Sequence, residues 1–127
     1  MIVDDDRCIG EGLRDRLDSI GYDTILMADG CSALATIALE SDRSPIHLVL
    51  LDLNMPGMDG MSVLREMRRK CGQIPVVLMS ATADHHEAFK AAIRAGARDF
   101  LRKPIDYKLL EETCRKQIGQ GVNGGKE

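Results

Sequence analysis

The sequence predicts an α/β fold in which a doubly wound parallel sheet carries helices on both faces. Three observations support this prediction: short apolar runs alternate five times with amphipathic segments, the connections are short, and acidic residues directly follow two of the runs. Alternating strands and helices with short connections favour a right-handed, doubly wound arrangement. Open α/β sheets bind ligands at the carboxyl ends of their strands, so acidic residues there indicate a functional edge.

Five short apolar segments are expected to form the strands. They read as continuous apolar runs rather than alternating ones, which is typical of strands buried on both faces of a parallel sheet. In chain order the expected strands are Met1–Val3, Thr24–Met27, His47–Leu51, Pro75–Met79 and Asp99–Leu101.

Five longer segments are expected to form helices, because their apolar residues recur at three- and four-residue spacing. In chain order they are Arg7–Ile20, Cys31–Leu39, Gly60–Cys71, the segment from Asp84 to Ala95 and the segment from Asp106 to Ile118. The side chains expected to face the sheet are Ile9, Leu13, Leu17 and Ile20 in the first helix, Leu34, Ile37 and Ala38 in the second, and Val63, Leu64 and Met67 in the third.

Aspartates and glycines mark the expected helix ends. An aspartate before a helix accepts hydrogen bonds from its first free amides, and a glycine after a helix adopts the left-handed conformation easily. The expected N-caps are Asp6, Asp59, Asp84 and Asp106, and the expected stops are Gly21, Gly72 and Gly96. Asp6 is therefore not counted as a ligand candidate.

The composition fits a single soluble domain: 127 residues, 44% hydrophobic and 29% charged. A net charge of −3 and the lack of tryptophan argue against direct nucleic-acid binding by this segment. No apolar run approaches the roughly 20 residues that a membrane helix needs, and the acidic start is the reverse of a signal peptide. We therefore expect a cytoplasmic protein that makes no membrane contact, with its four widely spaced cysteines reduced.

Carboxylates gather at two of the expected strand ends. Asp4 and Asp5 follow the first strand, and Asp52 follows the third. Carboxylates brought together at one sheet edge repel one another. A hard cation that prefers oxygen ligands offsets this repulsion. The sequence therefore predicts a Mg²⁺ site at this edge.

Two more residue pairs follow expected strands: Ser80-Ala81 after the fourth and Lys103-Pro104 after the fifth. In addition, the segment Met-Pro-Gly-Met-Asp-Gly follows Asp52 at residues 55–60. Each alone is ordinary, since a strand-end serine or a surface lysine needs no function. Together with the acidic pair, in this order and spacing, they are specific. From Ile2 to about Ile118 the chain resembles the receiver domain of bacterial response regulators.

The resemblance implies a flavodoxin-like sheet of strand order 2-1-3-4-5 with five helices. Its topological switch point, between strands one and three, would face Asp4, Asp5 and Asp52. The implied receiver domain covers residues 1–118, and residues 119–127 would be a flexible glycine-rich tail or the start of a linker. The implied function is a phosphorylation-operated signalling switch that catalyses only its own phosphorylation and dephosphorylation, rather than an enzyme acting on other substrates.

The resemblance assigns the acceptor and the metal ligands. Asp52 would accept a phosphoryl group from a phosphohistidine on a sensor histidine kinase or a histidine phosphotransfer protein. Asp5 would bind Mg²⁺ directly, Asp4 would act through metal-bound water, and Asp52 with the backbone carbonyl of Asn54 would complete the protein ligands.

The resemblance also assigns the phosphoryl-binding and switch residues. Ser80, Ala81 and Lys103 would contact the phosphoryl group, and a cis Lys103-Pro104 bond would aim the ammonium inward. Ser80 and Phe100 would act as the switch. On its own, Phe100 would be interpreted as a core aromatic residue.

Two positions are expected to tune the lifetime of the phosphorylated state. Asn54 lies two residues beyond the acceptor and Thr82 two residues beyond Ser80, where the family places residues flanking the attacking water. Thr82 can equally well be interpreted as a loop residue whose hydroxyl only bonds the backbone. The signal would be read by an output domain, a partner or a second copy on the face made by the fourth helix, fifth strand and fifth helix.

Two other classes of protein share part of this pattern of residues. A haloacid-dehalogenase-type phosphotransferase also uses an aspartate nucleophile with Mg²⁺, but it has a second aspartate two residues on, where this chain has Asn54, and a cap domain. A binding-only pseudo-receiver typically lacks the acidic pair, the acceptor or the lysine, and this chain keeps all of them.

Overall fold

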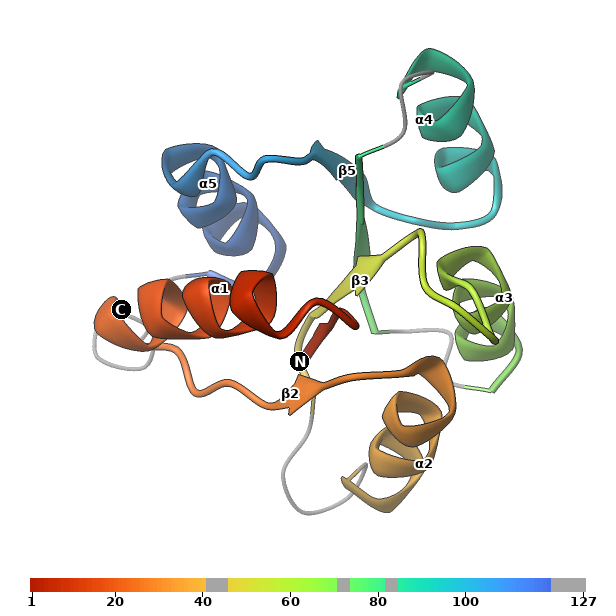
Figure 1. Cartoon of the computed structure of the whole chain (residues 1–127), viewed down its shortest axis with the longest axis horizontal. Coiled ribbons are helices and arrows are strands. Elements are labelled where there is room, and N and C mark those ends of the chain that lie inside the picture. The colour runs from red at the N-terminus through yellow and green to blue at the C-terminus, as the bar shows by residue number, and fades with distance from the viewer. Residues whose placement is uncertain (41–45, 71–73, 82–84, 120–127) are drawn as a thin grey trace.

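The structure is a computed structural model that describes residues 1–40, 46–70, 74–81 and 85–119. Figure 1 shows a five-stranded parallel sheet in the order β2-β1-β3-β4-β5. The fold class and the strand order 2-1-3-4-5 are therefore confirmed. The strands are β1 (Ile2–Val3), β2 (Leu26–Met27), β3 (Val49–Asp52), β4 (Val76–Ser80) and β5 (Asp99–Arg102).

Helices cover both faces of the sheet, as a doubly wound fold requires. In Figure 1, α1 and α5 lie on one side of the strands, and α2, α3 and α4 lie on the other. The helices are α1 (Arg7–Ser19), α2 (Gly30–Glu40), α3 (Gly60–Lys70), α4 (His85–Arg94) and α5 (Tyr107–Ile118). Within the described residues, no helix is long and apolar enough to cross a membrane.

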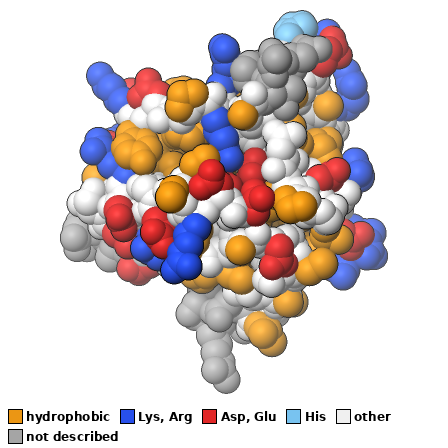
Figure 2. Space-filling view, viewed as in Figure 1, with side chains coloured by type: hydrophobic (Ala, Val, Ile, Leu, Met, Phe, Trp, Pro, Cys, Tyr) orange, Lys and Arg blue, Asp and Glu red, His pale blue; other side chains and the backbone are white. Residues whose placement is uncertain are grey.

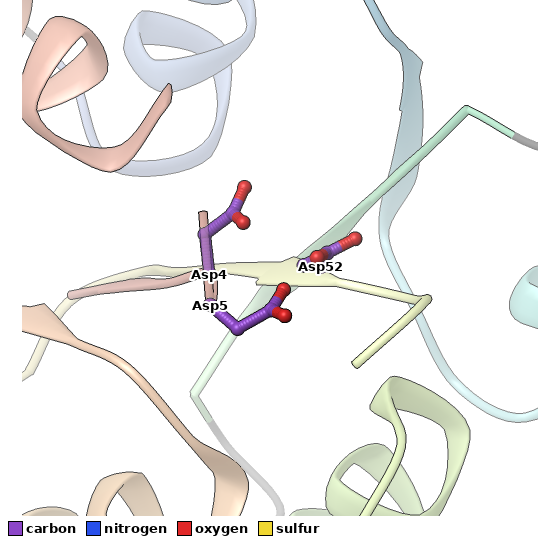
Figure 3. Close-up of side chains that lie close together, drawn as sticks. All are labelled: Asp4, Asp5 and Asp52. Atoms are coloured by element: carbon purple, nitrogen blue, oxygen red, sulfur yellow. The ribbon is translucent and has the colours of Figure 1, made fainter. Parts of the chain in front are cut away.

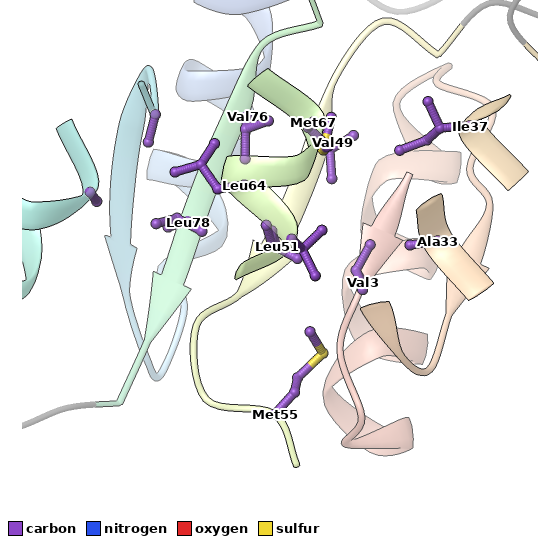
Figure 4. Close-up of a cluster of buried hydrophobic side chains, with 13 residues drawn as sticks. Val3, Ala33, Ile37, Val49, Leu51, Met55, Leu64, Met67, Val76 and Leu78 are labelled. Atoms are coloured by element: carbon purple, nitrogen blue, oxygen red, sulfur yellow. The ribbon is translucent and has the colours of Figure 1, made fainter. Parts of the chain in front are cut away.

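Alternate strand residues feed two hydrophobic cores, one under each layer of helices. Leu51 and Leu78 pack with buried residues of α2 and α3, the cluster drawn in Figure 4. Leu50 and Met79 pack against α1 and α5 on the opposite face. All four side chains are essentially inaccessible to solvent. Because they are closely packed, β3 and β4 hold the residues at their carboxyl ends rigidly.

Three strands, β3, β4 and β5, end one residue later than the sequence predicted, and the first two carry candidate site residues. Asp52 and Ser80 were expected just beyond their strands, but Asp52 pairs with Met79 and Ser80 pairs with Arg102 in the parallel ladder. The ladder continues past the apolar runs because the amide of Lys103 still bonds the Ser80 carbonyl at 2.8 Å. Both candidate side chains therefore stand on regular strand backbone rather than on a loop.

Some smaller expectations were also wrong. The second strand was expected from Thr24 but begins at Leu26, because its neighbour β1 is only two residues long and offers no further ladder partners. In the second helix Ala38 was expected to face the sheet but is exposed, and Ala33 is buried there beside Ile37 instead. The helix also begins earlier than expected, at Gly30.

The described capping residues behave as predicted. Asp6 accepts a hydrogen bond from the amide of Ile9, Asp59 from that of Ser62, and Asp106 from those of Lys108 and Leu109. Gly21 and Gly96 follow α1 and α4 with positive φ angles of 102° and 106°. The expected cap Asp84 and stop Gly72 lie outside the described residues.

Candidate functional site

Three aspartates meet at the carboxyl ends of two neighbouring strands of the sheet. Asp4 and Asp5 leave β1, and Asp52 ends β3, which is paired with β1 in the sheet. One oxygen from each carboxylate lies within 4.8 Å of the others. Figure 3 shows the three side chains together. Figure 2 shows acidic side chains near the middle of the face that is turned to the viewer in Figure 1. The predicted cluster is thus present.

The three carboxylates differ in exposure. Asp4 and Asp52 are buried, at 2% and 3% relative exposure, whereas Asp5 is exposed. A buried carboxylate is costly unless it is paired or hydrogen-bonded. The backbone amides of Asp6 and Asn54 supply one hydrogen bond each, to Asp4 at 2.9 Å and to Asp52 at 3.1 Å.

Lys103 supplies the positive charge. Its Nζ atom lies 2.9 Å from Oδ2 of Asp4 and 3.4 Å from Oδ1 of Asp52. The backbone leads into a cis Lys103-Pro104 peptide bond, as predicted. Three ionised carboxylates against one ammonium leave two negative charges in excess, which matches a divalent cation.

The electrostatics of the site make Asp52 a weaker acid than an ordinary aspartate when no cation is bound. Burial, assisted by the charge of Asp4, raises the pKa of Asp52 to about 6, although the Asn54 amide and Lys103 oppose the shift. For Lys103, burial lowers the pKa, but the hydrogen bond to Asp4 and the charges of Asp52 and Asp4 together raise it above its ordinary value. Lys103 therefore stays charged at neutral pH.

Ser80 lies at the adjacent strand end and is fully buried. Its hydroxyl donates a 3.1 Å hydrogen bond to the side-chain oxygen of Asn54. Asn54 itself is exposed, in the loop after Asp52. The structure therefore joins two residues that the sequence had assigned to separate roles.

The remaining expected residues lie further out. Ala81 is exposed just beyond β4. Phe100 lies on β5 and packs edge-to-face on Phe89 of α4, with ring centroids 6.1 Å apart. It is partly buried against the core under α2 to α4, so it borders α4 and not the carboxylates. Thr82 lies outside the described residues.

Three contributors were missed from the sequence. The Lys103–Asp4 ion pair, the Ser80–Asn54 hydrogen bond and the Phe89–Phe100 contact were not foreseen. For the first pair a signal existed, because a buried carboxylate cluster requires a local cation. For the other two pairs, the sequence carries no signal beyond placing each residue on its element.

The donor set suits Mg²⁺. Carboxylate oxygens are the protein ligands that Mg²⁺ prefers, and it usually keeps several waters, for which the exposed side of Asp5 leaves access. The backbone carbonyl of Asn54, expected as a further ligand, lies in the loop that follows Asp52.

Comparison with known proteins agrees with this geometry. A family model described as the response regulator receiver domain matches residues 1–115. The chain is 36% identical over 121 residues to the response regulator protein FleR of Pseudomonas aeruginosa, covering 94% of this chain and 24% of FleR. It is 40% identical over 115 residues to the response regulator MprA of Mycolicibacterium vanbaalenii, covering 91% of this chain and 48% of MprA.

A solved structure adds the same result in three dimensions. The receiver domain of NtrX from Brucella abortus superimposes with a TM-score of 0.82 at 34% identity, over 91% of this chain and 94% of that one. The chain thus spans nearly all of a receiver domain, but half or less of the length of FleR and MprA. From its sequence motifs, strand order and these matches, the chain belongs to the response regulator receiver domain family.

Proposed function

We propose that the chain, as a receiver domain over residues 1–118, is a signalling switch in which Asp52 accepts a phosphoryl group. One observation carries the proposal: the buried Asp52 carboxylate lies beside two further carboxylates and Lys103 at the topological switch point of the sheet. A lone acceptor, a cation site and a fixed ammonium are the parts that phosphoryl transfer to a carboxylate needs.

Mg²⁺ is the proposed cofactor. Asp5 and Asp52 would bind it directly together with the Asn54 carbonyl, and Asp4 would bind through a water. When bound, the ion neutralises charge on the transferring group and orients it for in-line attack. It also supplies counter-charge to the two buried carboxylates, which among the described residues otherwise pair with Lys103.

The transfer step uses this chain's own groups. An oxygen of the Asp52 carboxylate attacks phosphorus, the new acyl phosphate O–P bond forms, and the bond from phosphorus to the donor breaks with its electron pair going to the donor. The Asp52 carboxylate must be ionised to attack, and with a pKa of about 6 it is mostly ionised at neutral pH, a state that Lys103 favours. The ammonium of Lys103 would pair with a phosphoryl oxygen.

The proposed readout runs from Ser80 to α4. The Ser80 hydroxyl, which donates to Asn54 in this structure, would donate to a phosphoryl oxygen instead. Phe100 would then turn inward, which changes its contact with Phe89. Such coupling requires that the phosphoryl group contact one state better than the other. The face of α4, β5 and α5, where Phe89 is 44% exposed, would engage an output domain, a partner or a second copy.

The proposed setting is that of two-component signalling. The donor would be a sensor histidine kinase or a histidine phosphotransfer protein in the cytoplasm, and residues 119–127 would form a tail or the start of a linker. Asn54 and Thr82 would set the lifetime of the phosphorylated state, because small polar residues there leave water a path of attack.

Incubation with acetyl phosphate tests the proposal. Intact mass should show one phosphoryl adduct on the wild-type protein with Mg²⁺, and none on Asp52→Asn or in chelator. Asp23→Asn, at an exposed aspartate outside the cluster, is the matched control and should be phosphorylated like wild type. An equal adduct on Asp52→Asn would refute the assignment, steady turnover of simple phosphomonoesters would indicate a phosphatase, and no adduct would indicate a pseudo-receiver.

A further inference from the structure

Two helices begin with the same four-residue pattern, Asp-Gly-x-Ser. α2 begins within residues 29–32 and α3 within residues 59–62, and in each the serine amide donates to the aspartate, at 2.7 Å and 2.9 Å. Gly30 and Gly60 are the first helical residues, and both are buried. Their surroundings differ, and the difference concerns the candidate site.

Gly60 lies directly against the backbone of the acceptor strand. A Cβ atom on Gly60 would lie 2.6 Å from the Cα of Leu53, 3.1 Å from the carbonyl carbon of Asp52, and nearest of all to the Asp52 carbonyl oxygen. These neighbours are main-chain atoms, so no side-chain rotation relieves the overlap. Gly60 is not among the glycines with positive φ, so the lack of space, not the backbone conformation, requires glycine.

Neither side of this contact is free to retreat. The amide of Leu53 bonds the Met79 carbonyl at 2.8 Å, and the amide of Gly60 bonds the Leu53 carbonyl at 3.1 Å, which closes the loop. α3 is held in the core by three side chains without exposed surface: Val63, Leu64 and Met67. A well-packed core transmits a displacement rather than absorbing it.

We propose that Gly60 is a positioning residue for phosphoryl transfer. By letting α3 start against the backbone of Asp52, it holds the Asp52 carboxylate opposite Asp4 and Lys103. This inference rests on the proposed role of Asp52 as acceptor. A Cβ at position 60 displaces the end of β3, whereas Asp4 belongs to β1 and Lys103 follows β5, so the geometry between them changes.

The chain offers a matched control in Gly30. A Cβ there would meet the Cγ2 methyl of Val63 most closely and the Met58 carbonyl oxygen at 3.3 Å, and no atom of Asp52 is among its three nearest neighbours. Gly30→Ala therefore adds the same single carbon at the same place in the same capping pattern, but its closest contact is the end of the Val63 side chain and not the backbone of the acceptor strand.

The experiment compares the rate of phosphorylation by acetyl phosphate in wild type, Gly60→Ala and Gly30→Ala, at saturating Mg²⁺ and at a temperature where each is folded. Because a misplacement of about 1 Å lowers such rates by on the order of 100-fold, we expect Gly60→Ala to be at least about tenfold slower and Gly30→Ala within about twofold of wild type. Amide NMR shifts of Asp52 and Asn54 should move in Gly60→Ala only.

Equal rates in the two variants, with a phosphorylated wild type, overturn the inference. An unphosphorylated wild type instead overturns the proposed function. If Gly60→Ala does not fold, the capping pair Asp59→Ala and Asp29→Ala replaces it, because loss of Asp59 loosens the start of α3 alone. We then expect Asp59→Ala to be several-fold slower than Asp29→Ala, and equal rates overturn the inference.

Discussion

The Lys103 ammonium donates a 2.9 Å hydrogen bond to the carboxylate of Asp4, across 99 residues of sequence. Asp4 has no exposed side-chain surface. Lys103 is thus bound to a carboxylate of the candidate metal site and not aimed freely at an incoming phosphoryl group. A cation that neutralises the charge of Asp4 would release Lys103 to bind a phosphoryl oxygen. The proposed cation binding and the proposed phosphoryl binding by Lys103 are therefore coupled.

Replacing Lys103 tests this coupling. In chelator, Lys103→Met leaves two buried carboxylates without a cation, and removing one partner of a buried pair costs roughly 3 kcal/mol. Mg²⁺ then compensates, so its addition should raise the melting temperature more in Lys103→Met than in wild type. Arg102→Met, an exposed neighbour on β5, is the control. A smaller Mg²⁺ effect in Lys103→Met would contradict the compensation.

Mg²⁺ should stabilise the wild-type domain. A ligand that binds only the folded state at ten times its Kd adds about 1.4 kcal/mol to the free energy of unfolding. Asp5→Ala should abolish this gain, because Asp5 is the proposed direct ligand on the exposed side of the cluster. Asp23→Ala removes an exposed aspartate elsewhere and should keep it. Thermal unfolding with and without Mg²⁺ measures this gain in stability. If Asp5→Ala keeps the gain, the ion binds at another site.

The raised pKa of Asp52 predicts how stability depends on pH in chelator. Its pKa rises from 3.8 to about 6 on folding, so its favourable contribution is complete below pH 3.8 and is lost as the pH rises through 6. Asp52→Asn should therefore be more stable than wild type at pH 8, by roughly 1–3 kcal/mol, with no gain at pH 3.5. Denaturant unfolding at several pH values measures this.

The matched control for that prediction is Asp23→Asn, an exposed aspartate whose loss should leave the pH dependence unchanged. A gain for Asp52→Asn that persists undiminished to pH 3.5 would show that packing, and not the charge, sets the difference.

The hydrogen bond from Ser80 to Asn54 predicts the path of the switch. Beryllofluoride, a phosphoryl mimic, should shift amide NMR signals both around Asp52 and around Phe100 on β5. Ser80→Ala should keep the first set and lose the second, because it lacks the hydroxyl that moves. Ser62→Ala, a serine on α3, should keep both. Remote shifts that survive in Ser80→Ala would rule out this path.

Most of the fold was predictable because local signals agree with one another. Asp6 and Asp106 cap helices where the sequence placed them, and the continuous apolar runs of β3 and β4 marked the central strands. The strand ends were less predictable, since ladder hydrogen bonds extend through Asp52 and Ser80 irrespective of polarity.

The gathering of Asp4, Asp5 and Asp52 was predictable, but the contacts that these carboxylates make with other side chains were not. Parallel strands bring their carboxyl ends to one edge, which is enough to place Asp4 and Asp52 together. Which carboxylate Lys103 contacts depends on side-chain conformations and on burial that sequence does not encode locally. The tight fit of Gly60 against Asp52 likewise depends on how α3 docks, which only the packed structure shows.

Identifying the phosphorylated residue tests the central claim most directly. After acetyl phosphate and Mg²⁺ treatment, borohydride reduces an aspartyl phosphate to homoserine, and peptide mass spectrometry locates the change. We predict homoserine at position 52, dependent on Mg²⁺ and absent in chelator, with Asp4, Asp5 and Asp59 unchanged. Homoserine at another aspartate with Asp52 intact would contradict the account.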